Sequence, residues 1–195
     1  MLTPELSDTT MKMDKQEFWR LINDSREKSE GDQELQEQLL IDGLKAHTPD
    51  QIVEFESILR EYLIEADDFK IIAAQKIIEG SVSDDSYLYF RCWLIVQGDT
   101  VFLNALDDPD TLADVIEELY SEFDEVLEFE ELLYVATTAF EQRTGREEDE
   151  DDTFPRAVAS TRGLEYDFNV VTKGKDWTEE QLPMMFPKLW EKFNN

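Results

Sequence analysis

The chain has 195 residues, of which 41% are hydrophobic, and it contains 4 Trp, 6 Tyr and 12 Phe. This is enough apolar material for one domain with a single core, and it argues against intrinsic disorder. The 47 acidic residues far outnumber the 18 basic ones, which gives a net charge of -29. Such a chain repels nucleic-acid backbones and anionic lipids, so DNA, RNA and membrane surfaces are not expected as direct ligands.

The sequence offers few residues for disulfide or metal chemistry. Cys92 is the single cysteine and His47 the single histidine, which excludes an internal disulfide and a zinc site of the usual four-ligand or His-rich kind. We expect Cys92 to be an inert core thiol, His47 to be a surface residue beside a helix cap, and no cofactor or metal. The first 13 residues lack the pattern of a secretory signal, and no apolar run reaches the roughly 18 residues that span a bilayer, so the expected location is the cytoplasm.

Residues 1–12 show no amphipathic period and are expected to form a flexible extension, followed by a single all-α domain over residues 13–195. Apolar spacing up to residue 80 predicts four helices. Asp14 caps the first, Gly31 separates it from the second, and Thr48–Gln51 begins the third with the pattern of a capping box and a first-turn proline. Gly80 ends the fourth. The side chains expected to point inward are Phe18, Leu21, Ile22 and Ser25 in the first helix, Leu35, Leu39, Leu40 and Leu44 in the second, Ile52, Phe55, Leu59, Tyr62 and Leu63 in the third, and Ile71, Ile72, Ala74, Ile77 and Ile78 in the fourth.

The next part of the chain predicts a fifth helix over residues 83–96, a short segment over 101–106, and apolar helical stripes over 112–120 and 132–140. The run Glu147–Asp152 has six consecutive acids, which repel one another, so we expect a mobile acidic loop at about 146–155. The apolar alternation from Leu164 to Val170 has period two and suggests a short strand or an extended strap. Thr178 is the expected cap of a turn, and Pro187 the start of the last helix.

Residues 83–98 form the most unusual segment. Between Tyr87 and Val96 every residue except Arg91 is apolar or aromatic, which predicts a helix through the middle of a compact bundle with Arg91 buried inside it. A buried guanidinium keeps its charge and needs carboxylate or carbonyl partners. Three carboxylates are the candidates for this role: Asp68, Asp107 and Asp110.

Three motifs follow one another in an order that resembles a bacterial domain-of-unknown-function family, number 4240. The first motif is Phe18-Trp19-Arg20-Leu21-Ile22. The second is the segment 83–98, which begins with Ser-Asp-Asp and continues with Phe-Arg-x-Trp-Leu-Ile-x-Gln-Gly. The third is Ala105-Leu106-Asp107-Asp108-Pro109-Asp110-Thr111-Leu112-Ala113. The resemblance extends from about Met13 to Trp190, with Pro187–Trp190 similar to the family's closing element and the acidic run at 147–152 a departure from it. It implies a mainly helical cytoplasmic domain, with Met13 as a candidate native start, and it brings no established reaction, cofactor or catalytic residue.

The charge distribution favours a binding module that neutralises or regulates a basic partner protein, as toxin-immunity proteins and small acidic inhibitors do. No Lys or Arg occurs between Cys92 and Gln142, and carboxylates on one face would steer a cationic partner. The acidic residues expected to form the partner-binding surface are Asp114, Glu117, Glu118, Glu122, Asp124, Glu125, Glu128, Glu147, Glu148, Asp149, Glu150, Asp151 and Asp152.

Two other hypotheses remain open at this stage. One is an enzyme or small-ligand domain, since paired carboxylates near an arginine and an aromatic ring could perform acid-base chemistry or bind an anion. The residues of this hypothesis are Asp84, Asp85, Arg91, Trp93, Gln97, Asp107 and Asp110. The other is a mimic of DNA, which would need carboxylates in two ordered rows.

Overall fold

The computed structural model describes residues 13–119, 127–150, 152–165 and 171–194, and in these ranges it is a helical bundle without strands. This confirms the predicted all-α class. The α-helices are α1 (Lys15–Ser29), α2 (Gln33–Lys45), α3 (Pro49–Glu65), α4 (Phe69–Glu79), α5 (Asp84–Val96), α6 (Asp99–Asp107), α7 (Leu112–Leu119), α8 (Leu132–Thr144), α9 (Pro155–Thr161), α10 (Leu182–Met185) and α11 (Pro187–Phe193). Single turns of 3-10 helix occur at η1 (Pro109–Thr111), η2 (Glu148–Glu150) and η3 (Glu179–Gln181).

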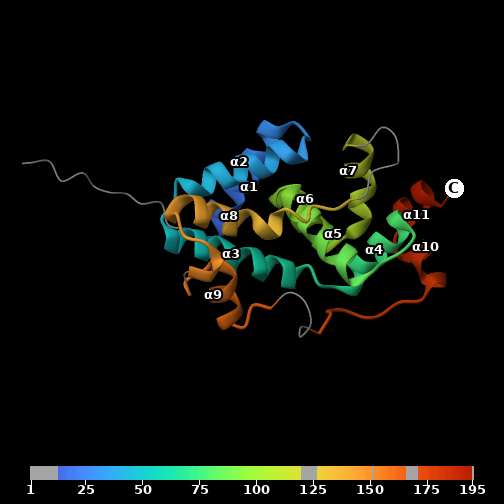
Figure 1. Ribbon diagram of the computed structural model, residues 1–195. Coiled ribbons are helices and arrows are strands. Elements are labelled where there is room, and N and C mark those ends of the chain that lie inside the picture. Colours follow the sequence, from blue (N-terminus) through green and yellow to red (C-terminus); the bar gives the residue numbers. More distant parts are fainter. Residues whose placement is uncertain (1–12, 120–126, 151, 166–170, 195) are drawn as a thin grey trace, which may run out of the picture.

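The helices are arranged around α3 and α5. Helix α1 packs on α2, α2 packs on α8, and α3 lies against both α8 and α9. The C-terminal helices α10 and α11 lie at the end of the molecule where α4 and α7 are found, away from α1 and α2 (Figure 1). Of the helices in the described part of the chain, none is both long and apolar enough to cross a bilayer.

Local hydrogen bonds explain where the helices begin. Thr48 and Gln51 form the predicted capping box, with Pro49 in the first turn of α3. Ser83 caps α5 in the same way, with Ser86 as its reciprocal partner. The carboxylate of Asp14 accepts hydrogen bonds from two amides in the first turn of α1. These bonds satisfy amides that have no partner inside the helix, which is why the short polar motifs predicted the helix starts.

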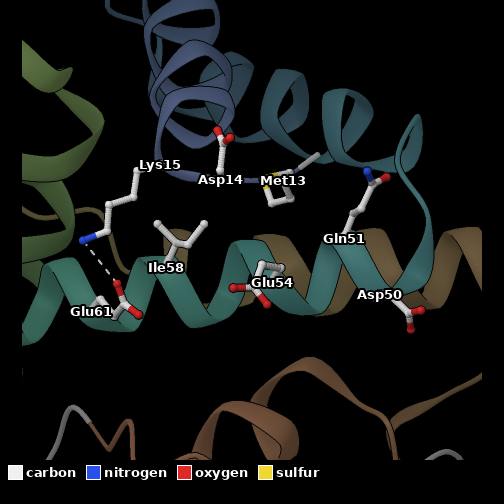
Figure 2. A pocket seen from close by; sticks show the side chains of 8 residues that line it. All are labelled: Met13, Asp14, Lys15, Asp50, Gln51, Glu54, Ile58 and Glu61. Atoms are coloured by element: carbon white, nitrogen blue, oxygen red, sulfur yellow. Dashed lines mark ion pairs between the residues drawn. The ribbon is translucent and has the colours of Figure 1, made fainter. Parts of the chain in front are cut away.

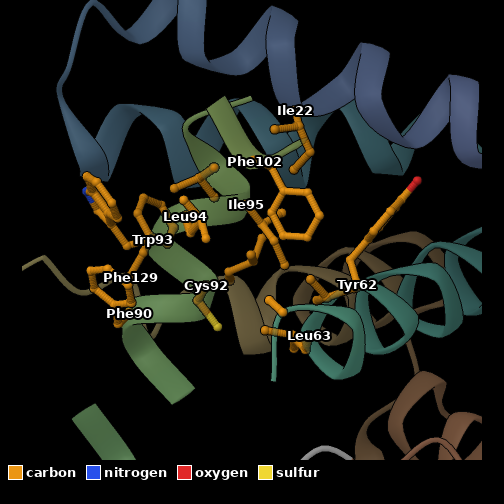
Figure 3. Close-up of a cluster of buried hydrophobic side chains, with 14 of the residues drawn as sticks. Ile22, Tyr62, Leu63, Phe90, Cys92, Trp93, Leu94, Ile95, Phe102 and Phe129 are labelled. Atoms are coloured by element: carbon orange, nitrogen blue, oxygen red, sulfur yellow. The ribbon is translucent and has the colours of Figure 1, made fainter. Parts of the chain in front are cut away.

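Helix α5 runs through the core as predicted. From Phe90 to Val96 every side chain is buried, and the Trp93 ring stacks on Phe90 with centroids 5.5 Å apart (Figure 3). Cys92 is fully buried in this helix, in agreement with the expected core thiol. Ala73 and Ala74 of α4 are also fully buried, in keeping with the close packing that small side chains permit.

One predicted core residue of α2 is misplaced. Leu35 was expected to point inward, but it is 42% exposed. The buried side of α2 is instead formed by Gln36, Leu40, Ile41 and Leu44. Gln36 is tolerated inside because its amide donates 2.9 Å to the carbonyl of Val96.

The C-terminal third differs from the expectation in part. The acidic loop contains the turn η2, and helix α9, which the sequence pattern did not predict, follows it. The predicted strand falls largely on residues 166–170, which lie outside the described residues, as do residues 1–12 and Asp151. Beyond them, Lys173 forms an isolated parallel bridge with Asp68. Gly174, with φ of 81°, allows this approach, because a Cβ there would lie 2.8 Å from an Asp68 carboxylate oxygen.

Candidate functional site

Arg91 is buried as predicted, at 5% exposure. Its guanidinium donates 2.8 Å to the carbonyl of Leu63 and lies 4.4 Å from the centre of the Tyr87 ring. Leu63 lies in the last turn of α3, where carbonyls lack partners inside the helix and the helix dipole is negative. Arg91 therefore caps the C-terminal end of α3 from inside the bundle.

The partner of Arg91 is thus a carbonyl, one of the two kinds expected, while the three candidate carboxylates serve other groups. Asp68 caps α4 by accepting a hydrogen bond from the amide of Lys70. Asp107 is exposed at the end of α6. Asp110 is buried and accepts hydrogen bonds from the amides of Lys188 and Leu189, at 3.1 and 2.9 Å. Asp110 thus stabilises the first turn of α11.

The remaining residues of the enzyme hypothesis lie at opposite ends of α5. Asp84 and Asp85 are exposed in its first turn, whereas Trp93 is fully buried and Gln97 follows the last turn. Because a helix rises about 1.5 Å per residue, Asp84 and Gln97 are about 20 Å apart along the axis. The Gln97 amide donates to the carbonyl of Trp93. The seven residues therefore do not converge on one cavity.

The predicted acidic surface is only partly described. Asp114 pairs with Lys188 at 3.0 Å, and both side chains are exposed. In the acidic run, Glu147, Asp149, Glu150 and Asp152 are exposed. The side chains of Glu117, Glu118 and Glu148 lie outside the described part of the structure, as do the residues Glu122, Asp124, Glu125 and Asp151.

The structure brings together a different set of carboxylates, which we call the acidic band. Its members come from α2, from the end of α4 and the start of α5, and from the segment that leads into α8: Glu34, Glu37, Glu79, Asp85, Glu128, Glu130 and Glu131. Hydrogen bonds between side chains and backbone groups hold these segments side by side. Gln33 donates to the carbonyl of Glu128, and the amide of Leu127 donates 3.2 Å to the Glu79 carboxylate. Only Glu128 belongs to the predicted surface.

The carboxylates of the acidic band act on one another. Burial and the charges of Glu131 and Glu34 raise the pKa of Glu37. Burial and the charge of Glu130 raise the pKa of Glu128. Like charges that approach one another, and burial, both disfavour ionisation. The band is therefore a place where the fold tolerates negative charge at a cost in stability.

Two tyrosines also belong to this region. Burial and the nearby Glu130 carboxylate raise the pKa of Tyr89 to about 12. The ring of Tyr134 is 42% exposed, and its hydroxyl donates 3.3 Å to Glu130. The guanidinium of Arg156 lies 5.0 Å from the centre of the same ring. An aromatic surface is thus available beside the carboxylates.

The exposed Leu35 lies in a shallow groove of about 420 Å³ on the outer side of α2. The groove is lined by Asp32, Glu34, Leu35, Glu37 and Gln38. Its lining combines one aliphatic side chain with three carboxylates and an amide.

A second groove, of about 520 Å³, lies between the start of α1 and α3 (Figure 2). Carboxylates line it too, but here basic side chains compensate them. Lys15 pairs with Glu61 at 3.3 Å, and Arg162 pairs with Glu54 at 3.0 Å. This groove is therefore a weaker candidate for a cationic ligand than the groove on α2.

Two buried polar clusters were not predicted. His47 was expected on the surface, but it is buried, and its two ring nitrogens lie 3.1 Å from the Gly43 carbonyl and 3.0 Å from the Glu17 carboxylate. Glu56 and Arg60 form a buried ion pair at 2.8 Å within α3. Their spacing of four residues was a local signal for this pair. The contact of His47 depends on a side chain thirty residues away and had no such signal.

Within the described ranges, no group of three or more His, Cys, Asp or Glu residues is arranged to hold a metal ion. The fold defines the class of this protein as an all-helical domain, and within the described residues no carboxylate of the acidic band takes part in an ion pair. The chain belongs to the family described as "Protein of unknown function (DUF4240)", whose model matches residues 13–142. The predicted closing element at Pro187–Trp190 lies beyond the matched range. No curated protein and no solved structure matches the chain.

Proposed function

We propose that this protein is a non-enzymatic cytoplasmic module that binds a basic partner protein through the acidic band, in the manner of an inhibitor or immunity protein. The observation that carries the proposal is the mutual action of the band carboxylates. Burial is the first cause that raises the pKa values of Glu37 and Glu128, and the charges that raise them further are those of other carboxylates. A partner that supplies Lys or Arg side chains would relieve this repulsion.

The physical gain has a kinetic part and an equilibrium part. A surface of one charge sign steers an oppositely charged partner and increases the association rate. Contact with basic side chains also removes the cost of holding the carboxylates together. Both effects require that the carboxylates lack basic partners in the free protein, and no ion pair of the described residues includes a carboxylate of the acidic band.

The enzyme hypothesis is less well supported by the contacts of its residues. Arg91 is used to cap α3, and Asp110 is used to stabilise α11. Asp84 and Asp85 occupy the first turn of α5, where carboxylates favour helix formation. Each residue thus has a structural role that does not require a substrate.

Affinity purification with matched variants tests the proposal. The band variant carries Glu34→Gln, Glu37→Gln and Glu131→Gln, and the control carries Glu147→Gln, Asp149→Asn and Glu150→Gln. Both variants lose three negative charges. We expect the wild type and the control to retain the same basic protein, and the band variant to lose it. Retention by the band variant, or recovery of no basic protein by the wild type, would contradict the proposal.

A further inference from the structure

The outer side of α2 presents an aliphatic side chain that the fold leaves without cover. Leu35 is 42% exposed, although the next residue of α2, Gln36, is buried on the inner side of the helix. The groove around it has carboxylates at its edges. An exposed leucine is not unusual by itself, but here it lines a groove together with Glu34 and Glu37 of the acidic band.

We infer that this groove takes an amphipathic basic segment of the partner protein, with an aliphatic or aromatic side chain on Leu35 and Lys or Arg side chains against Glu34 and Glu37. This inference rests on the proposed function and specifies the partner's chemistry. The ammonium or guanidinium groups match the carboxylates that line the groove, while the apolar side chain covers Leu35.

The composition of the groove favours a protein segment over a small polycation. A polyamine would satisfy the carboxylates but would leave Leu35 in water. A peptide can place basic and apolar side chains a few residues apart, as the recognition of amphipathic segments in grooves requires.

A second copy of this chain is a poor occupant. The net charge is -29, and two copies of the acidic band placed face to face would repel one another. Charge complementarity therefore selects a cationic partner.

Selection from a displayed library of random 12-residue peptides tests the inference, with the whole protein as the target. We expect the enriched peptides to combine Lys or Arg with at least one large apolar residue. One enriched peptide is then measured by fluorescence anisotropy against the wild type, Leu35→Ser, and the control Leu103→Ser, which alters an exposed leucine on α6. From the exposed part of Leu35 we expect Leu35→Ser to weaken binding roughly fivefold and Leu103→Ser to leave it unchanged.

Two comparisons separate the inference from the proposed function. The same peptide with its apolar residues replaced by Ser, and spermine, carry positive charge without an apolar group. If all three ligands bind the wild type equally, or if Leu35→Ser has no effect, the inference is wrong while the proposed function stands. If the selection enriches no basic peptides, both are wrong.

Discussion

Asp110→Asn should loosen the docking of α11 and lower the stability of the fold. The carboxylate of Asp110 accepts one hydrogen bond from each of two amides in the first turn of α11. This helix has only seven residues, so it depends on tertiary contacts for its stability. The site is 7% exposed, which limits the ability of water to replace the carboxylate.

The magnitude follows from what asparagine retains. Its amide oxygen can accept one of the two hydrogen bonds, while the second bond and the attraction of a negative charge for the helix N-terminus are lost. Loss of the bond costs about 1 kcal/mol and loss of the charge about 0.5 to 1 kcal/mol. We therefore expect Asp110→Asn to reduce the free energy of unfolding by about 2 kcal/mol.

Urea denaturation followed by circular dichroism measures this change, and hydrogen exchange over residues 187–193 localises it. Asp107→Asn is the matched control, since Asp107 is an exposed neighbour in sequence, and it should change stability by less than about 0.5 kcal/mol. If Asp110→Asn is as stable as the control, or if α11 exchanges at the same rate in both, the structural role of Asp110 is refuted.

Three further predictions concern the core and the acidic band. Arg91→Met should lower the free energy of unfolding by about 2 kcal/mol, because the Leu63 carbonyl loses its donor and the contact with the Tyr87 ring is lost. Urea denaturation measures this change, and a variant as stable as the wild type would contradict it. The pKa of Glu37 is raised from 4.5, so ionisation of this carboxyl destabilises the fold as pH rises above that value. Glu37→Gln should therefore stabilise the protein by a few tenths of a kcal/mol at pH 7 and give no gain below pH 4. Thermal denaturation at both pH values measures this difference. Burial raises the pKa of Cys92, so the native protein should resist alkylation, and rapid labelling by a thiol reagent without unfolding would disprove the expected inertness.

The sequence predicted those features whose cause is local. The capping box of Thr48 and Gln51 involves residues three apart, and Gly80 ends α4 through its own backbone conformation, with φ of 76°. Burial of Arg91 was predictable for a similar reason, because its neighbours in the helix are almost all apolar. Each of these conclusions needs only a few consecutive residues.

Features that join distant segments could not be predicted in the same way. The acceptor of Arg91 is a backbone carbonyl on another helix, and every residue has such a group, so the sequence could not single out Leu63. The wrong prediction for Leu35 has a related cause. Gln36, and not Leu35, lies on the inner side of α2, and its hydrogen-bond acceptor is the carbonyl of Val96 on α5. The acidic band joins three regions of the chain that lie far apart in the sequence, so the sequence could not show that their carboxylates meet.

Some arginines are bound inside the fold and do not lie on the surface with the acidic band. Arg60 is held by Glu56 inside the bundle, and the buried Arg91 binds the end of α3. These contacts use two arginines inside the fold of a protein that has 29 more acidic than basic residues. Since added salt screens exposed charges beyond about 10 Å at 0.1 M, the association rate with a basic partner should fall as ionic strength rises. The part of the affinity that comes from covering Leu35 should not fall with added salt, because burial of apolar surface involves no charge.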